Sequence, residues 1–207
     1  MQLKFLAVTD DQHSVQKLAS IIIEIKDCVD FVHVREKSKS MQELFLLLEL
    51  VEEGHVDKRK IVIHDRLDLA LIKDIPNIHL PGQGLPVKSV KEYFPSLRIG
   101  RSVHSFEEAR QAQLDGADYV LYGHVFRTNS KKGKPPKGLT EISEIKRKLD
   151  IPIFVIGGIT PDRINGIMLA NADGIAVMSG IFASDHPAAA AQLYFKRCRE
   201  ETDEKVL

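Results

Sequence analysis

The sequence predicts an α/β protein, a (β/α)8 TIM barrel in which eight parallel strands are each followed by a helix. Short β-branched runs alternate with amphipathic segments along almost the whole chain, which indicates a parallel sheet with right-handed crossovers. Eight such units can be counted, the number that closes a barrel. The competing fold, an open doubly wound sheet, would place a glycine-rich loop after the first strand, where this chain has Thr9-Asp10-Asp11.

The first four units are predicted from short apolar runs that end in polar or turn residues. Strands are expected at residues 3–8, 31–34, 60–63 and 77–80. The helix expected at 15–26 repeats apolar residues at helical spacing, and the one at 41–53 carries a leucine-rich stripe on its inner side. A short helix is expected after residues 64–68, and another at 87–94.

The second half of the chain repeats the same pattern. Strands are expected at residues 97–101, 117–122, 153–156 and 174–177. Helices are expected at residues 105–115, 139–149 and 188–199. A further helix starts with Thr160 as its N-cap and Pro161 at its first position. The long polar loop at 127–137 is the one obvious insertion, and loops of this kind are often functional.

Composition is that of an ordinary globular protein, and we expect residues 1–207 to form a single domain. The 29 acidic and 29 basic residues balance, so no overall field would recruit nucleic acid or an anionic membrane. Cys28 and Cys198 lack metal-ligand spacing, which argues against a disulfide framework or a zinc site and fits a reducing cytosol. We see no signal peptide or membrane span and expect a cytoplasmic protein. Whether it forms a homo-oligomer stays open.

Small residues at the ends of the last two strands predict a phosphate site. Gly157 and Gly158 follow the seventh strand, and Met178-Ser179-Gly180 follow the eighth. Glycines let an anion approach several backbone N–H groups, and the serine adds a hydroxyl. In barrels of this kind the usual phosphate pocket lies after strands seven and eight, at a short extra helix. The alternative is that these glycines only terminate strands.

Histidines follow strands at the same rim. His124 comes directly after the sixth strand, and we predict it to be the acid/base residue because imidazole titrates near neutrality and can carry a proton between two carbon atoms. Its alternative is an ordinary loop histidine. His104, after the fifth strand, is the second candidate, as a hydrogen-bond orienter. His33 and His79 fall inside strands and are expected in the core or the barrel interior.

Charged residues at the rim favour an anionic ligand. Arg35 and Lys37, after the second strand, can hold a carboxylate or a phosphate, with a solvated surface run as the alternative. Lys131 is expected in a solvated loop, unless it folds over an anion. Asp65 alone is a weak magnesium site, because it lacks a partner carboxylate. We therefore expect no metal and no cofactor.

Seven stretches, in order along nearly the whole chain, carry a resemblance to a known family. They are "FVHVREKS", "HDRLDLAL", "IHLPGQGLP", "IGRSVHSFEEA", "GADYVLYGHVFRT", "PIFVIGGITPDR" and "ADGIAVMSGIF". In these stretches the chain resembles the thiamin phosphate synthase superfamily, and in particular its TenI branch, the thiazole tautomerases. The resemblance implies a thiazole phosphate as the small-molecule partner.

Departures from the synthase pattern favour the TenI branch. The synthases have Asn-Asp where this chain has His64-Asp65, and an acidic residue where Gly84 stands. Those two acids hold the magnesium that binds the pyrimidine pyrophosphate. The synthases also typically have Gly-Pro where this chain has Gly123-His124. Loss of an acid and gain of a histidine predict proton transfer in place of pyrophosphate displacement.

The resemblance thus implies a thiazole tautomerase, an isomerase that aromatises a carboxylated thiazole phosphate by a cofactor-free 1,3-proton shift. By matching positions, His124 would be the acid/base residue. The phosphate would be held by Gly158, Met178, Ser179 and Gly180. The carboxylate and ring side would be lined by Arg35, Lys37, Ser102, His104 and Thr128.

Two other functions stay open. One is a Mg²⁺-dependent thiamin phosphate synthase that couples thiazole phosphate to the pyrimidine pyrophosphate, which the missing acid at Gly84 disfavours. The other is a non-catalytic regulatory protein of the TenI type. The sequence shows no helix-turn-helix and no basic face, so direct DNA binding is not expected.

Overall fold

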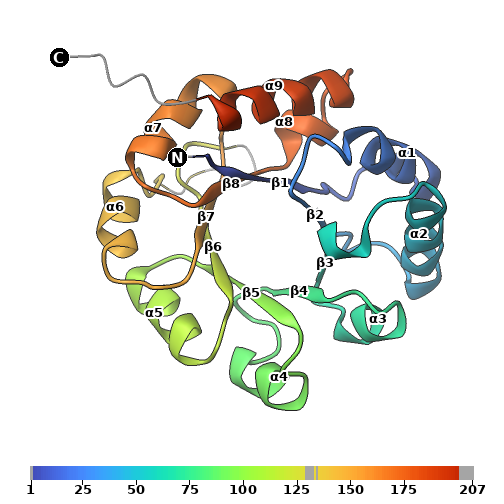
Figure 1. Cartoon of the computed structure of the whole chain (residues 1–207), viewed down its shortest axis with the longest axis horizontal. Coiled ribbons are helices and arrows are strands. Elements are labelled where there is room, and N and C mark those ends of the chain that lie inside the picture. Colours follow the sequence, from blue (N-terminus) through green and yellow to red (C-terminus); the bar gives the residue numbers. More distant parts are fainter. Residues whose placement is uncertain (1, 129–132, 134, 201–207) are drawn as a thin grey trace.

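A closed eight-stranded barrel forms the centre of the computed structural model, which describes residues 2–128, 133 and 135–200 (Figure 1). Each strand runs parallel to both neighbours in sequence order, and β1 pairs with both β2 and β8. The strands are β1 (Lys4–Val8), β2 (Phe31–Val34), β3 (Ile61–His64), β4 (Asn77–Leu80), β5 (Arg98–Val103), β6 (Tyr119–Gly123), β7 (Ile153–Ile156) and β8 (Gly174–Val177). The predicted (β/α)8 TIM barrel is confirmed.

Helices surround the barrel and cover its outer face (Figure 1). They are α1 (Val15–Ile25), α2 (Met41–Glu53), α3 (Leu67–Ile72), α4 (Val87–Tyr93), α5 (Phe106–Leu114), α6 (Thr140–Lys146), α7 (Ile164–Leu169), α8 (Ser179–Phe182) and α9 (Pro187–Arg199). Two 3₁₀ turns, η1 (Lys58–Lys60) and η3 (Pro161–Arg163), precede β3 and α7. Within the described part of the chain, no helix has the length and apolar character that crossing a bilayer would demand.

Apolar side chains fill two regions that the strands separate. The larger region lies between the strands and the helices, and the smaller one fills the barrel itself. The buried members of the smaller region are Leu6, Val8, Tyr119, Leu121, Phe154 and Ala176. Successive residues of a strand point to opposite faces, so Leu6 and Val8 enter the barrel while Ala7 between them packs outward. Both faces of every strand are therefore covered, as parallel sheets require.

Side-chain caps explain where several helices begin. The Ser40 side chain accepts a hydrogen bond from the Glu43 N–H, and the Glu43 carboxylate accepts one from the Ser40 N–H, which makes a capping box before α2. Ser14 and Ser105 cap α1 and α5 through one hydrogen bond each. A cap of this kind typically stabilises a helix by about 1 kcal/mol.

Some boundaries differ from the predicted ones. β5 runs to Val103, beyond the predicted 97–101, because Ser102 and Val103 still pair with β6. The helix expected from Thr160 starts as the turn η3 and continues as α7, without a capping bond from the Thr160 side chain. The predicted loop at 127–137 lies partly outside the described residues.

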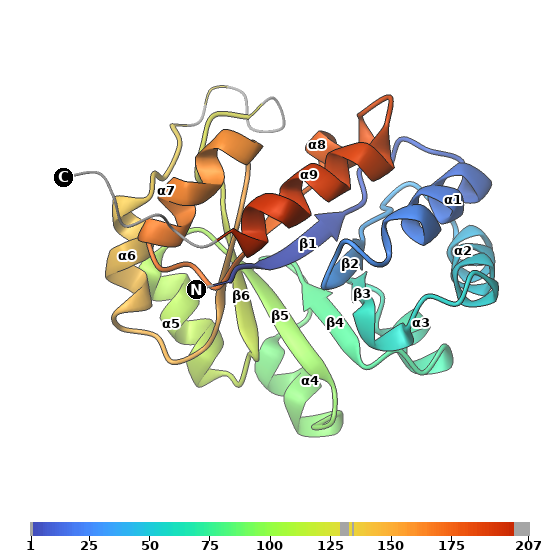
Figure 2. The same cartoon turned by 45° about the horizontal axis from the view of Figure 1, so that its top comes forward.

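The first and last elements meet at the amino end of the barrel. The Leu3 N–H donates to the Cys198 carbonyl oxygen at 3.1 Å, and Arg199 Nη1 donates to the Leu3 carbonyl oxygen at 3.1 Å. Arg199 Nη2 also contacts Asp30 Oδ2 at 3.1 Å, and that carboxylate accepts from the Phe5 N–H. Figure 2 shows α9 lying beside β1. The last helix therefore fastens the first strand.

Substituting Gly100 by alanine should destabilise the barrel interior. A Cβ at position 100 would lie 2.0 Å from Cζ of Tyr119, a completely buried ring. Inserting extra carbon into a packed core typically costs about 1–3 kcal/mol. We expect Gly100→Ala to lower the free energy of unfolding by that amount, measured by urea denaturation. Gly82→Ala is the matched control, since its added Cβ would meet the Ser102 carbonyl oxygen at 3.9 Å, an ordinary van der Waals contact. Equal stabilities of the two variants would contradict the packing around Tyr119.

Candidate active site

A cavity of about 750 Å³ opens at the carboxyl ends of the strands, a size typical of small-molecule sites. Barrel enzymes carry their active sites at this end. The site residues predicted from the sequence all line the cavity: Arg35, Lys37, Ser102, His104, His124, Thr128, Gly158, Met178, Ser179 and Gly180. The fold thus brings these residues together, and the role of each stays a prediction.

Backbone N–H groups gather where β7 and β8 end. Gly157 has a φ of +107° and Gly158 a φ of +65°, a region of backbone conformation that favours glycine. A Cβ at Gly158 would lie 2.3 Å from the Arg127 carbonyl oxygen, so position 158 has no room for a side chain. Ser179 and Gly180 open the helix α8, and N–H groups of a first helical turn lack intrahelical acceptors. This β7–β8 wall is therefore suited to an anion.

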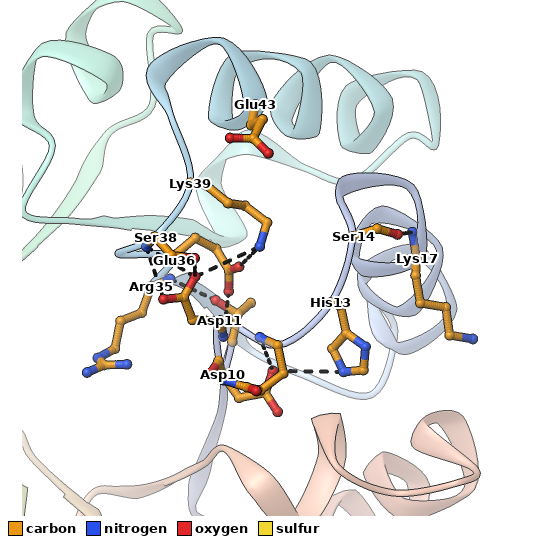
Figure 3. Close-up of polar contacts among 12 residues, drawn as sticks. Asp10, Asp11, His13, Ser14, Lys17, Arg35, Glu36, Ser38, Lys39 and Glu43 are labelled. Carbon is orange, nitrogen blue, oxygen red and sulfur yellow. Dashed lines mark hydrogen bonds and ion pairs between the residues drawn. The ribbon is translucent and has the colours of Figure 1, made fainter.

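A network of charged residues orders the loops that follow β1 and β2 (Figure 3). The completely buried side chain of Glu36 accepts a hydrogen bond from the Asp11 N–H at 3.1 Å and pairs with Lys39 Nζ. The Arg35 N–H donates to Thr9 Oγ1 at 2.8 Å. In Figure 3 the Arg35 side chain extends away from this network. The contacts therefore hold the backbone in place and leave the guanidinium outside them.

Asp11 fixes the far end of the same loop. Its carboxylate accepts from the Ser38 N–H at 3.0 Å and from Ser38 Oγ at 2.7 Å. Burial alone would raise the pKa of Asp11, but the hydrogen bonds from Ser38 lower it. Arg35 and Lys37, which lie between the two anchored ends, both line the cavity. They form a cationic wall on the β2–β3 side.

The two rim histidines lie between these walls. His124 follows β6 and is buried, with 7% of its surface exposed, yet it lines the cavity. His104 Nδ1 lies 2.7 Å from the Gly123 carbonyl oxygen. That contact is a hydrogen bond only when Nδ1 carries the proton, so the neutral His104 ring keeps its lone pair on Nε2. The role of His104 as a hydrogen-bond orienter stays a prediction.

The loop after β6 is described only in part. Thr128 lines the cavity at its start. Lys131, for which we predicted a solvated loop or a contact with an anion, lies outside the described residues. Lys39 and Arg66 also line the cavity, although sequence reasoning assigned neither a role. Arg66 follows Asp65 just beyond the third strand, and this position could have indicated that its side chain lies at the rim of the cavity.

Three imidazoles that sequence reasoning did not bring together lie on adjacent strands. The ring centroids are 5.0 Å apart for His33 and His64, 4.5 Å for His64 and His79, and 5.4 Å for His33 and His79. Burial lowers the pKa of His79 to about 3 and holds those of His33 and His64 well below their usual value. All three rings are therefore neutral at pH 7. His33 and His79 lie inside the barrel wall, as expected.

Asp65 is the place to test for a divalent cation, although the sequence led us to expect no metal. Among the described lining residues the carboxylates are Glu36 and Asp65, and Glu36 is already paired with Lys39. Asp65 is exposed, and a Cβ at Gly84 would lie 2.7 Å from Asp65 Oδ1, so the glycine leaves this carboxylate uncrowded. Mg²⁺ is commonly bound by one or two carboxylates plus substrate phosphates. Asp65 alone would supply a single carboxylate to a Mg²⁺, so the ion would depend on substrate phosphates for its other ligands.

Fold and cavity together define a (β/α)8 barrel with a cavity at the carboxyl ends of its strands, lined by a cationic wall and by a wall of glycines and backbone N–H groups. The family model described as thiamine monophosphate synthase matches residues 5–181. A thiamine-phosphate synthase of Natronomonas pharaonis is 35% identical over 195 residues, which cover 89% of this chain and 90% of that protein. Another, of Moorella thermoacetica, is 36% identical over 164 residues, 78% of each chain.

The solved structure of a thiamine phosphate pyrophosphorylase from Pyrococcus furiosus superposes with a TM-score of 0.80 and 29% identity, covering 95% of both chains. This chain belongs to the thiamine monophosphate synthase family. Members of the family named above are enzymes of thiamine biosynthesis, so the broader prediction of a thiamine-pathway enzyme is confirmed.

The narrower prediction of a thiazole tautomerase is wrong, because the curated relatives are named thiamine-phosphate synthase. An isomerase is therefore not supported, and the TenI branch is not confirmed. The tautomerase prediction depends on the departures at His64, Gly84 and His124. Each changes a single side chain and leaves both walls of the cavity in place. Such local changes do not outweigh similarity along the whole chain.

Removing the charge of Glu36 should destabilise the cationic wall. Glu36→Gln leaves the Lys39 ammonium, whose side chain is 8% exposed, without its nearest anionic partner, so that only Asp11 Oδ1 at 3.9 Å remains. Breaking a buried ion pair from one side typically costs about 3–5 kcal/mol. We expect a loss of about 3 kcal/mol in the free energy of unfolding, measured by urea denaturation.

Glu52→Gln provides the matched control for that measurement. Glu52 pairs with Lys58 at the surface, where ion pairs contribute little to stability. Its substitution should therefore change the unfolding free energy much less than Glu36→Gln does. An equal effect of the two substitutions would show that the Glu36–Lys39 pair does not support the loop.

Proposed function

We propose that this chain is a thiamine-phosphate synthase, a transferase that couples a thiazole phosphate to a pyrimidine pyrophosphate. The observation that carries the proposal is the pair of anion-binding walls on one cavity. A reaction between two phosphorylated substrates needs two such sites. The names of the relatives support the same activity.

The two walls lie at separate parts of the rim. Arg35 and Lys37 follow β2, which is three strands from β7 and two strands from β8 around the closed sheet. The β7–β8 wall offers backbone N–H groups and the Ser179 hydroxyl, whereas the β2–β3 wall offers Arg35 and Lys37. Ligands bound at both walls would place their rings between them, where Ser102, His104, His124 and Thr128 line the cavity.

Each wall would serve one substrate. The coupling forms a carbon–nitrogen bond between the thiazole ring and the pyrimidine methylene group, and it breaks the carbon–oxygen bond to the pyrophosphate, which leaves. Arg35 and Lys37 would stabilise the negative charge that develops on the leaving pyrophosphate. The β7–β8 wall would hold the thiazole phosphate and so orient its ring. Mg²⁺ held at Asp65 would supply further neutralisation of phosphate charge.

The activity is tested with the purified full chain, the two substrates and Mg²⁺. Thiamine phosphate is measured as fluorescent thiochrome, and released pyrophosphate is measured in parallel. We expect equimolar formation of both products. Arg35→Gln should raise the KM for the pyrimidine pyrophosphate about 10–100-fold, because it removes charge-assisted hydrogen bonds. Ser179→Ala should raise the KM for the thiazole phosphate, about 2–10-fold.

Arg59→Gln and Ser20→Ala are the matched controls. Arg59 lies on η1 at the amino end of the barrel with an 84% exposed side chain, and Ser20 is an exposed residue of α1. Both variants should keep the wild-type constants. Absence of coupled product in the wild type would refute the proposed activity. If Arg35→Gln and Ser179→Ala raised the KM for the same substrate, the assignment of one wall to each substrate would be wrong.

A further inference from the structure

Beside the cavity, three imidazoles converge on strands β2, β3 and β4. His33 Nδ1 lies 2.9 Å from His64 Nε2. One ring nitrogen from each of His33, His64 and His79 can be chosen so that all three lie within 4.8 Å of one another. His33 and His79 are completely buried, whereas His64 is partly exposed and lines the cavity. The cluster can therefore be reached from the substrate cavity through His64.

All three rings are in the state that binds metals. Their lowered pKa values keep them neutral at pH 7, and neutral imidazole is the metal-binding form. His79 Nε2 lies 2.7 Å from Ser102 Oγ, and His79 Nδ1 lies 3.3 Å from the Tyr119 hydroxyl. The shorter contact is the stronger hydrogen bond. If His79 donates from Nε2 to Ser102, its Nδ1 keeps a lone pair, and a ligating histidine is usually oriented through its other nitrogen in this way.

His33 carries an unexplained buried atom. Its Nε2 has no hydrogen-bond partner among the residues that the structure describes. Leaving a buried polar group unsatisfied typically costs about 1–3 kcal/mol. The contact between His33 Nδ1 and His64 Nε2 does not remove this cost, because it engages only one nitrogen of the His33 ring. A metal ion bound by Nε2 of His33 would satisfy this nitrogen, whereas an ion bound by Nδ1 would replace the contact with His64.

Spacing of the rings matches that of a three-histidine metal site. Tetrahedral coordination with metal–nitrogen bonds of about 2.0–2.1 Å places ligand nitrogens about 3.3 Å apart and ring centres roughly 5 Å apart. The three centroid separations here are 5.0, 4.5 and 5.4 Å.

We propose that His33, His64 and His79 form a binding site for one late first-row transition-metal ion, with Zn²⁺ and Co²⁺ as suitable occupants. Imidazole is a ligand that suits these ions, whereas Mg²⁺ prefers oxygen. The site is therefore distinct from the Asp65 position and does not depend on the proposed synthase activity. Arg98, Arg35, Lys37 and Arg101 lie near enough to act on these rings and would favour an anionic fourth ligand.

The test measures metal binding by the untagged full chain after treatment with a chelator. Titration calorimetry with ZnCl₂ should give one ion per chain, and CoCl₂ should produce the intense visible absorption of tetrahedral Co²⁺. An excess of MgCl₂ should displace neither ion. A stoichiometry near zero, or only the weak absorption of octahedral Co²⁺, would overturn the proposal.

Variants locate the ion. His64→Asn should abolish the Co²⁺ absorption, and Ser102→Ala should weaken Zn²⁺ binding about 10–100-fold by releasing the ring of His79. His55→Asn, which removes an exposed imidazole outside the cavity, is the matched control and should bind as the wild type does. Circular dichroism verifies that each variant is folded. If His64→Asn bound the ion as tightly as the wild type, the assignment to these three residues would be wrong. It would also be wrong if His104→Gln lost the ion while His64→Asn kept it.

Discussion

Closure of the parallel sheet is the constraint on which the site depends. Because β1 pairs with β2 on one side and with β8 on the other, the barrel has no free edge. All eight strands then end at one rim, and residues as distant in the sequence as Arg35 and Ser179 line a single cavity. The register of the strands also decides which side chains meet inside the wall. Tyr119, for example, fills the space that Gly100 leaves on the neighbouring strand.

Much of this arrangement could be predicted because it follows from short-range patterns. Apolar runs located the strands, and the rule that parallel strands share a carboxyl end placed His124 and Ser179 at one rim. The imidazole cluster could not be predicted in this way. The strand expected at 60–63 left His64 outside it, and only the observed register sets His64 opposite His79. The pairing of Glu36 with Lys39 likewise depends on how a loop folds back on itself.

Individual residues were not enough to choose between a tautomerase and a synthase, and similarity along the whole chain was also needed. Three substitutions suggested different chemistry, but they leave in place the two walls that we propose to hold phosphate groups. The neutral state of His64 fits this arrangement, because a charged imidazole on the cavity lining would compete with Arg35 and Lys37 for phosphate. A neutral His64 ring can accept or donate a hydrogen bond without that competition. The cavity thus keeps its strongest cationic groups at one side.

The hydrogen bonds between the end of α9 and the start of β1 have a practical consequence. Arg199 and Leu3 meet at the amino end of the barrel, on the side away from the cavity. A short peptide could bridge these neighbouring positions while new chain ends are opened in a surface loop elsewhere. A carrier protein or solid support attached at this pole would leave the entrance for small molecules clear.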